Sequence, residues 1–322
     1  MAKRATVLRW TGEGDFARLE ASVERILGAR RIQAAVRRMG DSLAVTGPEP
    51  ALVSALFQHM PGVAWSAAGI YATGLKGVTK ASATLASKYL RRRDRFSVDA
   101  EVSTGVPSDL AGAVTAAILE SVKGSRVSSY APKVRFRAAL DGSKGVVGVE
   151  IFQGPGGIPT GSVSAICFVS GGTHSSVVAW KAVLMGLRAK LVHVKSDEES
   201  LLAVANLYSE LSHRSDPRGL ALEVLDGASV PVALKRYAAG HAAISFGGFT
   251  AAGGNIPDML KGLVAAPLYL MPEETFEAEF SSLGLKGYDM KTEWDGDGSE
   301  KYSARSFGGL TADVSEVLDG LE

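Results

Sequence analysis

The sequence contains a single cysteine, Cys167, among its 322 residues. One cysteine excludes a disulfide within the chain and any zinc site built from several cysteine ligands. No apolar run approaches the roughly 18–20 residues that are needed to cross a bilayer. The basic start, MAKRATVLRW, also lacks the apolar stretch of a secretory signal. The sequence therefore predicts a cytoplasmic protein that makes no contact with a membrane.

Net charge is nearly absent as well, but the value of +1 conceals an asymmetry. Residues 1–162 carry 22 Lys and Arg against 13 Asp and Glu, whereas the remaining residues carry 13 against 21. A basic half beside an acidic half suggests that the first half binds a polyanion. The alternative is that the two halves attract each other. Because the basic residues cluster along the chain, the polyanion is favoured.

The first segment, residues 1–70, alternates between strand and helix periodicity. The expected elements are a strand at 6–10, a helix at 14–28, strands at 32–38 and 42–46, a second helix and a strand at 63–68. Leu52, Leu56 and Met60 are the expected apolar stripe of the second helix. The order β-α-β-β-α-β predicts a ferredoxin-like unit.

The second segment, residues 71–158, contains the densest positive charge. Its expected elements are a helix at 77–90, a strand at 96–102, a helix that starts near Pro107, and strands at 133–137 and 146–152. Two sets of basic residues are suited to binding the phosphate backbone of a nucleic acid. They are Lys88, Arg91, Arg92, Arg93 and Arg95, and the strand face of Lys133, Arg135 and Arg137. The alternative is a solvated surface whose arginines complement a helix dipole.

The third segment, residues 163–322, follows the breaker run GPGGIPTGS. Apolar strands are expected at 163–169, 189–194, 220–225, 242–246 and 268–271, with helices between them. Trp180, Val183, Leu184 and Leu187 are the expected apolar side of the first of these helices. Alternating strands and helices predict a parallel α/β sheet with helices on both faces.

The motif SGGTHSS, residues 170–176, lies between the first of these strands and the helix that follows it. Backbone N–H groups in such a turn form a concave anion site, and the helix N-terminus adds partial positive charge. Two adjacent glycines also leave room for a phosphate to approach the backbone. The alternative is an ordinary strand-to-helix turn, so the motif alone favours phosphate binding only slightly.

The series GPGGIPTG, strand, SGGTHSS resembles the junction in the tRNA 4-thiouridine synthetase (ThiI) family. The opening LRWTGEGDFARLE is similar to that family too, and the resemblance extends from residue 5 to about residue 285. It implies an α/β protein of three parts. These are a ferredoxin-like domain at 1–70, a THUMP RNA-binding domain at 71–158, and a Rossmann-like PP-loop adenine-nucleotide α-hydrolase domain at 163–322.

The resemblance implies tRNA as partner, ATP with Mg²⁺ as cofactor, and adenylation of a uridine before sulfur arrives. No structural metal is expected, and a homodimer is compatible with the family. The positions that match its nucleotide site are Val169, Ser170, Gly171, Gly172, His174, Ser175, His193, Val194 and Gly247.

Three departures from the family leave the catalytic role open. His174 stands where the loop of the family has an aspartate, and histidine is a poor ligand for Mg²⁺. The acceptor cysteine of the family has no counterpart, because Cys167 falls inside an apolar strand. Residues 286–322 do not resemble the family. One hypothesis is an enzyme of 4-thiouridine formation that takes sulfur from an external donor. The other is a catalytically inactive tRNA-binding protein whose nucleotide domain is a platform for a partner.

Overall fold

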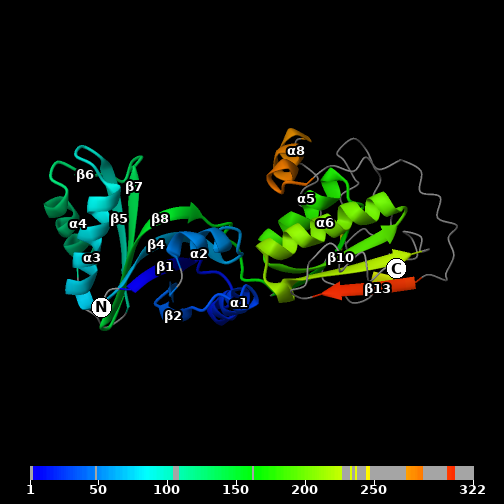
Figure 1. Cartoon of the computed structure of the whole chain (residues 1–322), viewed down its shortest axis with the longest axis horizontal. Coiled ribbons are helices and arrows are strands. Elements are labelled where there is room, and N and C mark those ends of the chain that lie inside the picture. The colour runs from blue at the N-terminus through cyan, green and yellow to red at the C-terminus, as the bar shows by residue number, and fades with distance from the viewer. Residues whose placement is uncertain are drawn as a thin grey trace. The chain divides into compact units, whose positions relative to one another are not determined.

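The structure is a computed structural model that forms two compact units, Met1–Pro159 and Thr160–Glu322 (Figure 1). It describes residues 3–47, 49–103, 109–161, 163–226, 233, 236–237, 244–246, 273–285 and 303–308. Pro107, Gly247 and the strand expected at 268–271 lie outside the described residues. Within the described part of the chain, no helix is long and apolar enough to cross a membrane.

The first half of unit 1 has the predicted ferredoxin-like order. Its elements are β1 (Lys3–Trp10), α1 (Phe16–Ala29), β2 (Ala35–Met39), β3 (Ser42–Thr46), α2 (Pro50–Phe57) and β4 (Val63–Thr73). Asp15 begins α1 by accepting a hydrogen bond from the N–H of Ala17 over 2.9 Å. The apolar stripe predicted for α1 is buried against the sheet, as expected from its helical spacing.

The buried face of α2 differs from the prediction. Leu52 is 60% exposed, whereas Val53 and Phe57 are buried and pack with the core of this half. The helix begins at Pro50 and ends at Phe57, so Met60 lies beyond it, although its side chain is buried. The sequence ALVSALF is apolar almost all round, and its periodicity therefore does not fix which side faces the sheet.

The second half of unit 1 extends the same sheet. Its elements are α3 (Gly74–Tyr89), β5 (Arg95–Val102), α4 (Leu110–Ser121), β6 (Arg126–Val127), β7 (Val134–Asp141) and β8 (Lys144–Gln153). The strand order is β2-β3-β1-β4-β8-β7-β5-β6. Helices α3 and α4 pack on one face of β5, β7 and β8 and bury Val134 and Phe136 (Figure 1).

β4 and β8 join the two halves of the sheet. Gly69 lies opposite Gly148 in their antiparallel register, and a Cβ on Gly69 would lie 2.1 Å from the carbonyl oxygen of Val147. Glycine is required there because the backbones approach too closely for a side chain. β4 runs across residue 70, so the predicted segments 1–70 and 71–158 share one continuous sheet. Their separation into two domains remains a prediction.

Unit 2 is built on a five-stranded sheet of order β12-β9-β10-β11-β13. Its elements are β9 (Val163–Phe168), α5 (Thr173–Leu184), β10 (Leu187–Lys195), α6 (Glu198–Arg214), the 3-10 turn η1 (Pro217–Gly219), β11 (Leu220–Asp226), β12 (Ile244–Phe246), α8 (Glu273–Ser282) and β13 (Ser303–Gly308). The four strands from β9 to β12 pair in parallel, as predicted. β13 pairs antiparallel with β11, which the sequence did not predict.

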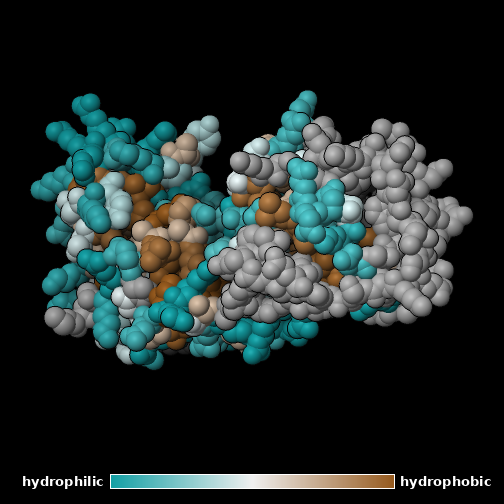
Figure 2. Space-filling view, turned by 45° about the vertical axis from the view of Figure 1, so that its right-hand side comes forward, coloured by the Kyte–Doolittle hydropathy of each residue, from teal (hydrophilic) through white to brown (hydrophobic). Residues whose placement is uncertain are grey.

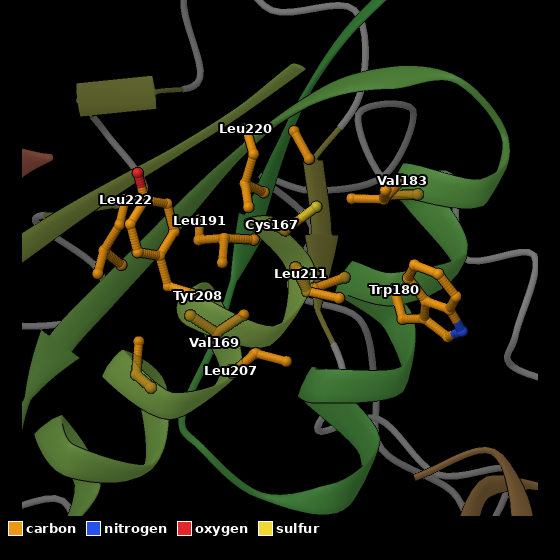
Figure 3. Packing of buried hydrophobic residues seen from close by; sticks show 14 of the residues in the cluster. Cys167, Val169, Trp180, Val183, Leu191, Leu207, Tyr208, Leu211, Leu220 and Leu222 are labelled. Atoms are coloured by element: carbon orange, nitrogen blue, oxygen red, sulfur yellow. The ribbon is translucent and has the colours of Figure 1, made fainter. Parts of the chain in front are cut away.

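Helices α5 and α6 cover the same face of this sheet and enclose its main core (Figures 1 and 3). Trp180 and Val183 of α5 pack there with Tyr208 of α6 and Leu191 of β10. Leu187 begins β10 and is not part of the helix, because the chain turns at residues 185–186, where Gly186 has a φ of 81°. The sequence prediction extended the helix too far because it overlooked Gly186, a glycine of the kind that commonly ends a helix.

Candidate functional site

The loop after β9 lies where the strand order of unit 2 reverses. From β9 the chain passes through α5 to β10 on one side, whereas β12 pairs with the other side of β9. Open α/β sheets bind ligands outside the carboxyl ends of their strands at such a point. The motif SGGTHSS occupies this place, so the fold supports the anion site that was inferred from the motif.

Gly171 has a backbone conformation and a close contact with α6 that favour glycine over any other residue. Its φ is +87°, in the left-handed region, and a Cβ there would lie 2.7 Å from the Cβ of Ala203 on α6. Gly172 is the N-cap of α5, and the first intrahelical hydrogen bond is the one that the N–H of Ser176 donates to its carbonyl oxygen over 3.2 Å. The N–H groups of residues 173–175 thus precede the helical ladder and are suited to an anion.

The serine hydroxyls close the loop on itself. The Oγ of Ser175 accepts a hydrogen bond from the N–H of Ser170 over 3.1 Å and donates to the carbonyl oxygen of Gly172 over 3.2 Å. The hydroxyl of Ser176 also donates to that carbonyl, over 2.9 Å. Backbone amides, with the hydroxyl of Ser170 beside them, are therefore the donors that this loop offers to a phosphate.

His193 and Val169 support the loop from the interior of the unit. His193 is 1% exposed and its Nδ1 lies 2.9 Å from the carbonyl oxygen of Val169. A carbonyl can only accept, so Nδ1 carries the proton and Nε2, which lies 3.3 Å from the Oγ of Ser200, is unprotonated. Burial lowers the pKa of His193 to about 4, so the imidazole is neutral at physiological pH. Val194 is half-buried at the end of β10.

Cys167 is buried, as the sequence predicted. It is 1% exposed and belongs to the core between the sheet and the helices α5 and α6 (Figure 3). A thiol in this position has no access to a persulfide donor or to a nucleic acid.

A group of exposed cations lies at the end of unit 1 where α3 meets β5. The exposed residues Lys88, Arg91, Arg92, Arg93 and Arg95 lie there, as predicted. Two further cations that the sequence did not assign, Lys123 and Arg126, join them, because the N–H of Arg93 bonds to Gly124 and Arg126 lies opposite Arg95 in the parallel β5–β6 register. Figure 2 shows hydrophilic side chains over this end of the unit.

Asp94 is the acidic residue embedded in this cationic end. Its carboxylate accepts hydrogen bonds from Lys133 over 2.8 Å and from the N–H of Arg91 over 2.7 Å. The bond from Lys133 lowers the pKa of the Asp94 carboxyl. The Asp94 carboxylate therefore holds the turn after α3 in place, while the exposed arginines around it keep the surface positively charged. Tyr130, which is 82% exposed, stands in the loop beside Lys133.

The rest of the predicted strand face is neutralised. Arg137 has a side chain only 12% exposed, forms ion pairs with Asp99 and Glu150, and lies over the ring of Trp65. Arg135, 46% exposed, pairs with Glu150 over 3.5 Å. The sequence could not place these partners, because Asp99 and Glu150 come from the neighbouring strands β5 and β8. A role in tRNA binding remains a prediction for both arginines.

Proteins of known name share sequence with part of this chain. Two curated relatives are both named probable tRNA sulfurtransferase. The protein from Methanocaldococcus jannaschii is 30% identical over 140 residues, which are 43% of this chain and 34% of that protein. The protein from Nocardia farcinica is 34% identical over 102 residues, which are 30% of this chain and 25% of that protein. The chain thus spans about a third or less of the length of the curated relatives that it matches. No protein-family profile matches it.

Two solved structures share the fold. The crystal structure of PH1313 from Pyrococcus horikoshii Ot3 has a TM-score of 0.68 at 17% identity and covers 88% of this chain and 100% of that one. The crystal structure of a 4-thiouridine synthetase–RNA complex with bound ATP has a TM-score of 0.66 at 17% identity, covering 88% of this chain and 85% of that one. The curated relatives show a sequence similarity to tRNA sulfurtransferases over part of the chain, and the two solved structures show the α/β fold that the resemblance implied.

The loop of this ThiI-like chain fits a phosphate better than it fits Mg²⁺. Its glycines leave room for a phosphate, and the backbone amides of the first turn of α5 are donors of the kind that a phosphate requires. His174, which the resemblance aligns with the family aspartate, is half-buried in the first turn of α5, and that turn has no acidic residue. Among the described residues, no group of three His, Cys, Asp or Glu is placed to hold a metal ion. The part of the chain that the structure describes therefore gives no hard ligand set for Mg²⁺.

Proposed function

We propose that this chain binds tRNA through the cationic end of unit 1 and takes part in 4-thiouridine formation. The observation that carries the proposal is the group of exposed cations at the α3–β5 turn, which surrounds the Asp94 carboxylate. Such a surface contacts phosphates without reading base edges, as recognition of an RNA duplex by shape requires. The names of the curated relatives, probable tRNA sulfurtransferase, point to the same substrate.

In this proposal the loop of residues 169–175 holds the phosphates of ATP, and the target uridine is adenylated beside it. Backbone amides at the start of α5 carry the phosphate charge, and Gly171 keeps the loop against α6. ATP, when bound, would donate its adenylyl group to the uridine oxygen with release of pyrophosphate, so that sulfur could later displace AMP. Sulfur would then come from an external persulfide donor, because the one cysteine of the chain is buried.

A second candidate function is tRNA binding without chemistry, with unit 2 as a platform for a partner protein. It is favoured by His174, which cannot coordinate Mg²⁺ beside the pyrophosphate as an aspartate would. In this reading the loop retains its anion site but transfers no adenylyl group.

One reconstitution separates the two functions. The full chain is incubated with unmodified tRNA, ATP, Mg²⁺ and a protein persulfide donor, and the tRNA nucleosides are analysed by mass spectrometry. Formation of 4-thiouridine that depends on ATP supports the enzyme. Salt-sensitive tRNA binding without any 4-thiouridine supports the binding protein, and the absence of tRNA binding contradicts both.

A further inference from the structure

Tyr130 is the most exposed of the large apolar and aromatic residues in the part of the chain that the structure describes. It is 82% exposed, and the next in order, Leu52, is 60% exposed. Within the described residues its ring forms no aromatic or cation–π contact, whereas the rings of Tyr71 and Tyr89 in the same unit each face a cation. The fold of unit 1 therefore does not use the ring of Tyr130 for packing.

The loop that carries Tyr130 is held in place by β5. This loop connects β6 to β7, and these two strands lie on opposite sides of β5. Where the loop begins, the N–H of Ser128 donates to the carbonyl oxygen of Phe96 over 2.8 Å. Where it ends, the N–H of Lys133 donates to the carbonyl oxygen of Arg95, also over 2.8 Å. The hydroxyl of Ser128 donates to the carbonyl oxygen of Tyr130 over 2.8 Å. The backbone of the loop is thus fixed, while the ring of Tyr130 lies in solvent.

Exposed cations flank this loop at both of its ends. Arg126 precedes it and lies opposite Arg95 in the parallel β5–β6 register, and Lys133 ends it on the other side of Arg95. Lys133 pairs with Asp94, whereas Arg95 and Arg126 form no ion pair within the described ranges. Neighbouring segments in such an arrangement are about 4.8 Å apart. Backbone contacts therefore bring the three cations and the loop of Tyr130 to the same place.

An exposed aromatic ring beside cations is the combination that binds unpaired nucleotides, because a base stacks on the ring while the cations contact the phosphates. We propose that Tyr130 stacks on an unpaired base of the RNA that the cationic end of unit 1 binds. The inference rests on the proposed tRNA binding, which concerns phosphates alone. It adds a preference for RNA in which an unpaired nucleotide adjoins a duplex.

Binding of RNA hairpins by variants of the full chain tests the inference. The hairpins share one stem, which is blunt, extended by a single-stranded 3′ end, or extended by a single-stranded 5′ end. Tyr130→Ala should weaken binding of an extended hairpin at least about fivefold, the lower bound for loss of one stacked base. It should leave binding of the blunt hairpin within about twofold of the wild type. The slope of log K against log salt should not change, because the substitution removes no charge.

Two controls separate the ring from other effects. Tyr130→Phe keeps the ring without the hydroxyl and should bind the extended hairpins as the wild type does. Leu52→Ala removes another exposed apolar side chain from unit 1 and should change binding of no hairpin. The Tm of each variant should match that of the wild type, because both side chains lie in solvent.

The outcomes distinguish this inference from the proposed function. Equal losses for blunt and extended hairpins in Tyr130→Ala, or no loss for either, would overturn the inference. A loss in Tyr130→Phe as large as in Tyr130→Ala would also overturn it, since the hydroxyl and not the ring would then be responsible. If Arg91→Ala/Arg92→Ala/Arg93→Ala weakened binding of every hairpin while Tyr130→Ala changed none, the proposed function would stand alone. If the wild-type chain bound no RNA, both would fail.

Discussion

His193 donates a hydrogen bond from Nδ1 to the carbonyl oxygen of Val169 over 2.9 Å, which ties β10 to the start of the candidate nucleotide loop. On its other side the imidazole lies 3.3 Å from the hydroxyl of Ser200, which belongs to the first turn of α6. The same turn packs against Gly171. One buried, neutral imidazole therefore holds together the strand, the helix and the loop that form the site.

The neutral state of His193 predicts that unit 2 loses stability in acid. The pKa of His193 is about 4 in the folded chain, against about 6.5 for an unfolded one. Between these values only the unfolded state binds the proton, so stability present above pH 6.5 is lost as the pH falls toward 4. The contribution amounts to about 3 kcal/mol. Urea unfolding of His193→Asn should show a shallower loss from pH 7 to pH 5 than the wild type. His213→Asn, at an exposed position, should keep the wild-type slope, and equal slopes in all three would refute the assignment.

Gly171→Ala should destabilise unit 2 by about 2–4 kcal/mol, because it adds left-handed strain to a contact of 2.7 Å with Ala203. Gly284→Ala is the matched control. Gly284 also has a positive φ, of 72°, but a Cβ there meets no atom within 4 Å. It should cost only about 1 kcal/mol. Thermal unfolding followed by a probe in unit 2 gives both values, and equal losses would show that packing against α6 is unimportant.

His174→Asp should raise the affinity for ATP in the presence of Mg²⁺ by about threefold or more, because it restores a hard ligand beside the loop. Titration calorimetry with and without EDTA measures the change. His174→Asn keeps the size of the aspartate without its charge and should bind as the wild type does. An equal gain in both variants, or no gain in either, would remove the argument that His174 limits Mg²⁺ binding.

Cys167→Ala should leave any donor-dependent thiolation of tRNA unchanged within about twofold. The thiol is 1% exposed in the core of unit 2, and a persulfide relay requires an accessible thiolate. Mass spectrometry of tRNA nucleosides measures the product. If 4-thiouridine formed with the wild type and vanished with the variant, Cys167 would be a working nucleophile.

Much of this fold could be predicted from the sequence, because local periodicity determined it. The buried stripe of α1 and the parallel strands β9, β10 and β11 follow from spacing and apolar runs. The exposure of Leu52 could not be predicted, since α2 is apolar almost all round. Ion pairs between residues of neighbouring strands also could not be predicted from the sequence. Arg137 is predicted as a free cation from its own strand, but Asp99 and Glu150 reach it from two others.

Part of the candidate site could likewise be predicted from the sequence, and part of it could not. The motif SGGTHSS and its place after β9 were evident from the sequence, whereas its position at the reversal of strand order required the pairing of β12 with β9. The supporting role of His193 required the three-dimensional contact with Val169. Arg126 was missed because β6 is only two residues long and gives no periodic pattern, and Lys123 was missed because it lies in the connection before β6.

The central claim is that the cationic end of unit 1 binds tRNA, and salt-dependent binding by the full chain tests it most directly. Filter binding of tRNA should give a steep fall of log K with log salt. Arg91→Ala/Arg92→Ala/Arg93→Ala should weaken binding at least tenfold and flatten the slope. Lys76→Gln/Lys80→Gln/Lys144→Gln removes the same charge from exposed residues of unit 1 outside the cluster and should change affinity by less than about threefold. An affinity that is insensitive to salt, or equal losses in the two triple variants, would contradict the account.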